Sequence, residues 1–342
     1  MSKFDQTLAD HFPDSYSDDD GYWAPSRECG NTATAVSACP LPQYDFVLLN
    51  GPDSAKFLQG QTTCDWNQIT AEQASPGAYC NIKGRVMSSF LALAPDNQSA
   101  MLRMRRDICE STRDLLAKYI VFSKAEITAP PRHYHAIGLW GANAADTVRE
   151  LFGEAPSHRF HSTAGEPGFV LQLDDAGTRF ECWLSDDNAA SLWPRIAGMA
   201  EVCNSAEWER GNIAAGIAEI SSTTQDQFIP QQINYQLIGA VNFKKGCYTG
   251  QEIVARMQYR GKLKKRLYRL RTESTCSAAR LDEICTTDGT AVGTIAAIVN
   301  GGAASDLLAM LNIDAIEQTL LVGSDRVPAA LEDLPYPLPP ID

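Results

Sequence analysis

Short apolar runs separated by turn residues set the pattern of the chain up to about residue 200. Phe46-Val47-Leu48-Leu49 is typical of a buried strand, and Asn50-Gly51-Pro52 ends it before a helix that begins near Asp53 or Ser54. The same reasoning predicts further strands at 78–81, 86–94, 99–104, 136–140, 169–173 and 180–184, and helices at 107–118, 143–151 and 188–200. Strands and helices mixed in this order indicate an α+β fold.

The pattern changes from Leu267 onward. Short apolar runs there are separated by the turn signals Asp288-Gly289 and Asn300-Gly301, and no long helical period appears. This part of the chain predicts a small antiparallel barrel or sandwich.

The first 42 residues have few periodic apolar positions and several acidic ones, including Asp14 and the run Asp18-Asp19-Asp20. Burial within such a segment does not repay the entropy of ordering it. We therefore expect residues 1–42 to form a flexible acidic tail.

A chain of 342 residues exceeds the usual size of one domain, so two or three domains are expected. We assign residues 43–255 to an α+β region and residues 256–342 to a C-terminal β-barrel. Pro130-Pro131 marks a subdomain boundary near residue 130 within the α+β region, and the first subdomain resumes near residue 205.

The composition is that of a globular protein, with 44% hydrophobic and 21% charged residues. No run reaches the ~18–20 consecutive apolar residues that a membrane span needs, and the N-terminus lacks the basic and apolar regions of a signal peptide. We expect a cytoplasmic protein without a membrane partner. The ten cysteines form no C-x-x-C pair, so the sequence signals neither a disulfide framework nor a local metal site.

The segment from Lys244 to Glu252 is the densest candidate for chemistry. Thr249 and Glu252 have the spacing of a capping box, which predicts a helix that begins at Thr249. Cys247 then lies two residues before that helix and two after Lys245, where the helix dipole and the ammonium both favour thiolate over thiol. The alternative interpretation is a small buried cysteine beside a helix start.

The same segment carries a family resemblance, because Lys-Gly-Cys-Tyr-x-Gly-Gln-Glu is similar to the signature of YgfZ-type proteins. Four further segments resemble the family in its order: Phe57-Leu58-Gln59-Gly60-Gln61, residues 118–124, Ala214-Ala215-Gly216-Ile217 and Phe228-Ile229-Pro230-Gln231. YgfZ-type proteins are relatives of the glycine-cleavage T-protein, an aminomethyltransferase. The resemblance implies two intertwined ferredoxin-like α/β subdomains and a small C-terminal antiparallel β-barrel around a central folate pocket.

The resemblance also implies a cofactor and site residues. The cofactor is tetrahydrofolate or a derivative, and Trp208 is similar to the family tryptophan whose flat ring contacts it. Tyr44 occupies the position nearest to a second aromatic contact, and Gln231 and Lys245 belong to family segments assigned to cofactor binding. Cys247 is the implied reactive, catalytic residue. For Trp208 taken alone, a core tryptophan on an amphipathic helix is the ordinary interpretation.

The implied function is that of a folate-binding accessory protein for maturation or repair of iron–sulfur enzymes, including some that modify tRNA. The implied partners are folate and iron–sulfur client enzymes or assembly proteins. Two alternatives stay open: a folate-dependent aminomethyl or one-carbon transferase, and a non-catalytic interaction module. Aminomethyltransferases of this superfamily carry a Gly-Gly-x-x-Asp-Asp type segment, whereas the corresponding residues 81–89 contain no carboxylate, which favours the accessory role.

Charge is unevenly distributed along the chain. The net charge is −13, yet the stretch from Arg256 to Arg271 contains eight basic residues and no acidic one. This run is either a solvated surface or a contact for a polyanion, such as the polyglutamate tail of folate or an RNA-bearing partner.

Overall fold

The computed structural model describes residues 1–17, 21–25, 35–128 and 134–340. These residues form two compact units. Unit 1 comprises Met1–Leu58, Trp66–Ser75 and Leu91–Trp208, and unit 2 comprises Gln59–Asp65, Pro76–Phe90 and Glu209–Asp342. The expected subdomain boundary at Pro130-Pro131 lies outside the described residues.

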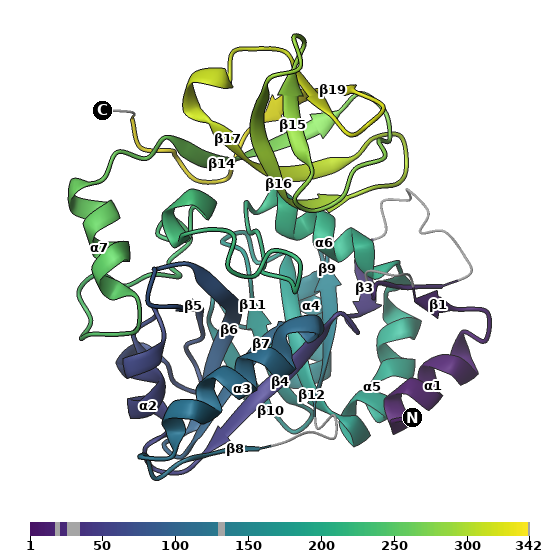
Figure 1. The fold of residues 1–342 in the computed structure, drawn as a ribbon. Coiled ribbons are helices and arrows are strands. Elements are labelled where there is room, and N and C mark those ends of the chain that lie inside the picture. The colour runs from purple at the N-terminus through teal and green to yellow at the C-terminus, as the bar shows by residue number, and fades with distance from the viewer. Residues whose placement is uncertain (18–20, 26–34, 129–133, 341–342) are drawn as a thin grey trace. The chain divides into compact units, whose positions relative to one another are not determined.

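The main sheet of unit 1 has six strands in the order β10-β11-β12-β9-β3-β13 (Figure 1). The strands are β10 (Ser162–Gly165), β11 (Gly168–Gln172), β12 (Arg179–Ser185), β9 (Tyr134–Trp140), β3 (Ser37–Pro40) and β13 (Glu201–Val202). The helices whose side chains share a core with this sheet are α1 (Lys3–His11), α4 (Ala144–Phe152) and α5 (Asp186–Met199).

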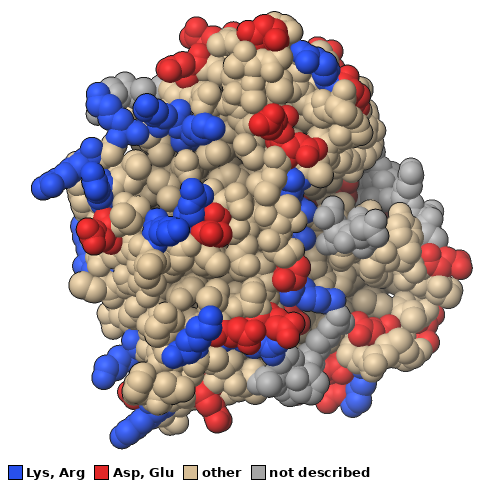
Figure 2. Space-filling model, in the orientation of Figure 1, with Lys and Arg blue, Asp and Glu red and all other residues tan. Residues whose placement is uncertain are grey.

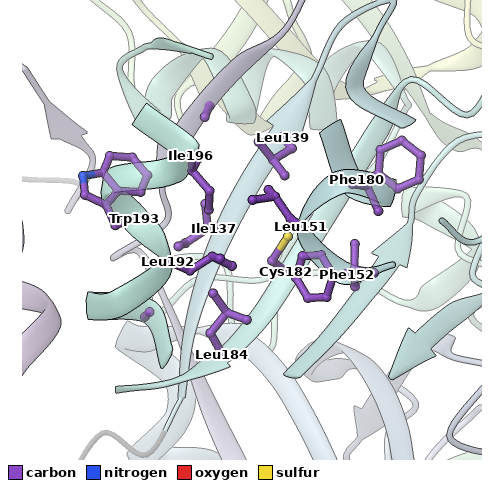
Figure 3. Close-up of a cluster of buried hydrophobic side chains, with 14 of the residues drawn as sticks. Ile137, Leu139, Leu151, Phe152, Phe180, Cys182, Leu184, Leu192, Trp193 and Ile196 are labelled. Carbon is purple, nitrogen blue, oxygen red and sulfur yellow. The ribbon is translucent and has the colours of Figure 1, made fainter. Parts of the chain in front are cut away.

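The sequence of strand β9 is a nearly continuous run of apolar residues, because both faces of the sheet are covered. Successive side chains of a strand point to opposite faces. Ile137 and Leu139 belong to the cluster formed with α4 and α5, which Figure 3 shows, whereas Ala136 belongs to a second buried cluster that includes Trp208. Because both faces are covered, both sets of side chains are apolar.

A second sheet has the order β5-β6-β7-β4-β8. Its strands are β5 (Ser75–Cys80), β6 (Val86–Asp96), β7 (Ser99–Arg105), β4 (Tyr44–Asn50) and β8 (Glu126–Thr128). The neighbouring segments of the chain are α2 (Ser54–Gln61), the 3-10 turns η1 (Trp66–Gln68) and η2 (Arg106–Ile108), and α3 (Cys109–Ile120). A short pair, β1 (Tyr16–Ser17) and β2 (Trp23–Ala24), precedes them.

Unit 2 ends in a closed antiparallel barrel in the order β14-β17-β16-β15-β18-β19. Its strands are β14 (Lys265–Thr272), β17 (Asp306–Asn312), β16 (Ala291–Val299), β15 (Glu283–Thr286), β18 (Leu320–Val322) and β19 (Val327–Glu332), and η4 (Ile313–Ala315) follows β17. Before the barrel come α6 (Ser205–Ala214), η3 (Pro230–Ile233) and α7 (Gln251–Arg260). The predicted α+β class and C-terminal barrel are confirmed, although α7 continues across the boundary expected at 256.

The prediction of a flexible tail over residues 1–42 is wrong for the described part of that segment. Helix α1 begins with a capping box in which the Ser2 and Asp5 side chains each accept from the other's backbone N–H. Phe4 is 2% exposed, and its ring packs edge-on against His135 and Trp193. The apolar surface that orders this helix comes from residues more than a hundred positions away.

We expect Phe4→Ala to lower the free energy of unfolding by about 3–5 kcal/mol, because it removes a buried ring and leaves a cavity. Gln6→Ala, on the exposed side of the same helix, should change it by less than about 0.5 kcal/mol. Urea unfolding of both variants checks this. Equal stability of the two variants would show that Phe4 of α1 does not pack in the core of unit 1.

Candidate functional site

Lys245 is the anchor of the loop that carries the predicted reactive cysteine. The Asn242 Oδ1 accepts hydrogen bonds from the backbone N–H groups of Lys244 (2.8 Å) and Lys245 (3.1 Å), which turns the chain. The Lys245 ammonium is buried and donates to the carbonyl oxygens of Gln59 (2.8 Å), Thr62 (2.5 Å) and Cys64 (2.7 Å). All three protons of this ammonium therefore have an acceptor.

Cys247 lies two residues beyond this anchor and is exposed. Of the other cysteines that the structure describes as free thiols, Cys285 is partly buried and the rest are buried. Burial raises the pKa of Cys64 to about 11 and that of Cys80 to about 12, so these thiols stay protonated near neutral pH. Among the free thiols in the described ranges, access alone therefore makes Cys247 the one that a partner or reagent reaches first.

The predicted capping box at Thr249 is wrong. Helix α7 begins at Gln251 after Gly250, which has a φ of 83° and gives no side-chain cap. A Cβ at position 250 would lie 2.4 Å from the carbonyl oxygen of Asn81, so this close approach requires glycine. The Thr249 hydroxyl instead donates to Gln61 Oε1 (3.2 Å).

Because α7 begins at Gln251, Cys247 lies outside the first turn of the helix. The thiol is four residues before the first helical residue of α7, and the helix dipole acts mainly on the first turn. The ammonium of Lys245, two residues before the thiol, donates to three carbonyl oxygens and not to the sulfur. What the structure provides is an accessible thiol on an anchored loop.

Gln231 is also in unit 2 and lies in η3. Its side chain is 3% exposed, and Nε2 donates to the carbonyl oxygen of Val254 in α7 (2.7 Å). The Gln231 Oε1 and the Tyr248 hydroxyl are buried and have no hydrogen-bond partner among the described residues. Buried polar atoms of this kind are candidates for contacts with a polar ligand.

Tyr44 and Trp208 belong to one buried cluster of unit 1 and are 3% and 1% exposed. The guanidinium of Arg103 lies 4.0 Å from the centre of the Tyr44 ring, and that of Arg179 lies 4.0 Å from the Trp208 ring. Trp208 also packs on β9, where a Cβ at Gly138 would lie 2.4 Å from the indole. One face of each predicted contact ring is therefore covered by an arginine.

A buried ion pair beside these rings was missed by sequence reasoning. Glu181 is 0% exposed; its Oε1 forms an ion pair with Arg103 Nε at 2.8 Å and accepts a hydrogen bond from Trp183 Nε1 at 2.7 Å. The available signal was an acidic residue inside the apolar run 180–184, because a buried carboxylate needs partners and marks a special environment.

A second missed residue is Asp226. Its carboxylate accepts from Asn81 Nδ2 at 2.6 Å, and its backbone N–H donates to Val86. The segment 81–89, which contains no carboxylate of its own, therefore has one beside it from a part of the chain 145 positions away. Local sequence gives no signal for this pairing.

The described residues contain no group of three or more His, Cys, Asp and Glu side chains arranged to hold a metal ion. None of the helices in the described ranges combines the length and the hydrophobicity needed to cross a bilayer.

Comparison with solved structures defines the class of fold. The glycine cleavage system aminomethyltransferase T from Bartonella henselae matches 96% of this chain and 95% of its own with a TM-score of 0.73, at 12% identity. This chain therefore has the same fold as that aminomethyltransferase. No family model matches the chain.

Comparison with curated proteins places the chain more closely. It is 35% identical over 259 residues to the tRNA-modifying protein YgfZ of Escherichia fergusonii, covering 76% of this chain and 78% of that protein. The YgfZ protein of Escherichia coli O127:H6 gives the same values. The chain belongs to the YgfZ family.

Burial of Lys245 predicts an unusual titration. Desolvation lowers the pKa of this ammonium from 10.5 to about 8, so between these values the unfolded chain holds a proton that the folded protein has released. The contribution of Lys245 to the free energy of unfolding then rises as pH increases from about 8 to about 10.5. An NMR titration of the lysine side chains should show the Lys245 Cε resonance changing near pH 8. A midpoint at the ordinary lysine value would contradict the buried geometry.

Proposed function

We propose that this protein binds a reduced folate and supports the maturation or repair of iron–sulfur enzymes, including enzymes that modify tRNA. The observation that carries the proposal is the exposed Cys247 on a loop anchored by buried Lys245, in a chain of the YgfZ family. The curated relatives are named tRNA-modifying proteins, which supports the tRNA part of the role.

The residues present fit a folate in their chemistry. A reduced folate has a flat ring system with hydrogen-bonding edges, and buried aromatic faces and buried polar atoms suit such a ligand. Unit 1 offers Tyr44 and Trp208, whose Nε1 is buried without a partner among the described residues. Taken separately, Gln231 of unit 2 also has a buried Oε1 without a partner among the described residues. When bound, tetrahydrofolate supplies one-carbon chemistry.

Cys247 is the residue that we assign to contact with client proteins. Its exposure makes the sulfur available to a partner macromolecule, which a buried thiol is not. Lys245 holds the loop by its three hydrogen bonds and so acts as a positioning residue.

A second candidate function, folate-dependent aminomethyl or one-carbon transfer, is favoured by one observation. The Asp226 carboxylate lies beside Asn81, where the family of transferases carries its acidic segment. The Asn81 side chain donates to this carboxylate and accepts from the Lys83 backbone N–H, so the region is organised around the Asn81 amide rather than around a free acid. We therefore keep the accessory role as the leading proposal.

Trp208→Phe should weaken tetrahydrofolate binding by about 1 kcal/mol, or roughly fivefold, because it reduces the aromatic face and removes the indole N–H. Alanine is the poorer choice here, since Trp208 is 1% exposed and its loss costs about 3–5 kcal/mol of stability. Trp193→Phe is the matched control: Trp193 is also fully buried with an unpartnered Nε1 among the described residues, but in the other cluster of unit 1. Equal folate affinity of both variants would remove Trp208 from the site.

Cys247→Ser should abolish support of iron–sulfur enzymes in a deletion strain while the thermal midpoint stays within about 1–2 °C of the parent, because the side chain is exposed. Cys285→Ser, at a partly buried thiol of the barrel, is the control and should complement fully. Full complementation by Cys247→Ser would favour the non-catalytic module instead.

A further inference from the structure

Helix α7 presents one face that is both aromatic and basic. Arg256, Tyr259 and Arg260 are separated by three and four positions, so they lie on the same side of the helix. Both arginines are exposed, and Tyr259 is 71% exposed. The opposite side is buried through Val254, whose carbonyl oxygen accepts from Gln231. The helix is thus anchored on one side and leaves an aromatic ring and two guanidinium groups exposed on the other.

The basic character continues beyond the helix. Lys262 and Lys264 are exposed in the connection to β14. Among the described residues, these two lysines, Arg256 and Arg260 have no ion-pair partner. Figure 2 shows Lys and Arg side chains gathered over α7 and the start of β14, on the left of the view. We call Arg256, Tyr259, Arg260, Lys262 and Lys264 the α7 face.

A second aromatic side chain supports the exposed ring. Phe243 packs edge-on against Tyr259 with ring centres 6.1 Å apart and an interplanar angle of 70°. This contact leaves the tyrosine ring oriented and still largely exposed. Phe243 is followed directly by the exposed Lys244, so the same surface leads into the loop that carries Cys247.

The chemistry of the α7 face selects one class of partner. Exposed rings combined with cationic side chains are the means by which proteins bind unpaired nucleic acid, because a base stacks on the ring while phosphates contact Lys and Arg. A polyglutamate chain uses the charges but has no flat group for Tyr259. A regular duplex offers phosphates but keeps its bases stacked on one another.

We propose that the α7 face binds a single-stranded segment of RNA, with Tyr259 stacked on a base and the four basic side chains near phosphates. RNA is chosen over DNA because the curated relatives are named for tRNA modification. The binding surface consists of residues of unit 2 alone and requires no folate. A loss of RNA binding is therefore distinguishable from a failure of the proposed folate-dependent function.

The test is fluorescence anisotropy of the full-length protein with a labelled, unstructured RNA of about 12 nucleotides. Tyr259→Ala should weaken binding by about 5- to 150-fold, the loss of one stacked base, whereas Tyr259→Phe should stay within about twofold of the parent. The double variant Arg256→Gln/Arg260→Gln should weaken binding and reduce the slope of log affinity against log salt by about 1.4.

Matched controls separate the α7 face from general charge. Lys118→Gln/Lys124→Gln removes two exposed charges near the end of α3 in unit 1 and should leave RNA affinity unchanged. Thermal midpoints confirm that each variant is folded. Equal RNA binding by Tyr259→Ala and the parent, or equally good competition by a polyglutamate peptide or an RNA duplex, would overturn the proposal.

Discussion

The loop that carries Cys247 depends on one buried ammonium. Lys245 donates to three carbonyl oxygens, that of Gln59 in the last turn of α2 and those of Thr62 and Cys64 just beyond the helix. Carbonyl groups at the end of a helix lack intrahelical partners and carry the negative end of its dipole, so a cation is favourable there. Loss of this ammonium would remove all three charge-assisted hydrogen bonds, which contribute about 1.5–3 kcal/mol each.

This constraint explains how a residue of the C-terminal half becomes part of a defined site. Segment 59–65 belongs to unit 2 although its neighbours in sequence belong to unit 1. Lys245 binds it through main-chain oxygens, so the contact depends on the path of the backbone and not on the identity of the side chains. Cys247, two residues on, is thereby held near a fixed piece of chain and remains exposed.

The local elements were largely predictable from sequence, because each depends on its own pattern. The strand expected at 86–94 is β6 (Val86–Asp96), and the helix expected at 143–151 is α4 (Ala144–Phe152). The tail was mispredicted because the partners of Phe4 come from β9 and α5, far along the chain. The capping box failed because the approach of Asn81 requires the left-handed Gly250 before α7.

The site was predictable only in part, for the same physical reason. The accessible cysteine and the lysine beside it are in one segment, which sequence alone identified. The arginines over the aromatic rings, the Glu181 ion pair and the Asp226 contact join residues that are distant in sequence. Such pairs are determined by strand order and register, and no local pattern specifies them.

The most direct test of the account is a titration of the purified protein with tetrahydrofolate, followed by tryptophan fluorescence, with glycine-cleavage aminomethyl transfer assayed on the same preparation. The account predicts saturable binding with a change in fluorescence and no transfer above background. Absence of binding would contradict the folate role, and efficient aminomethyl transfer would contradict the accessory role in favour of the transferase.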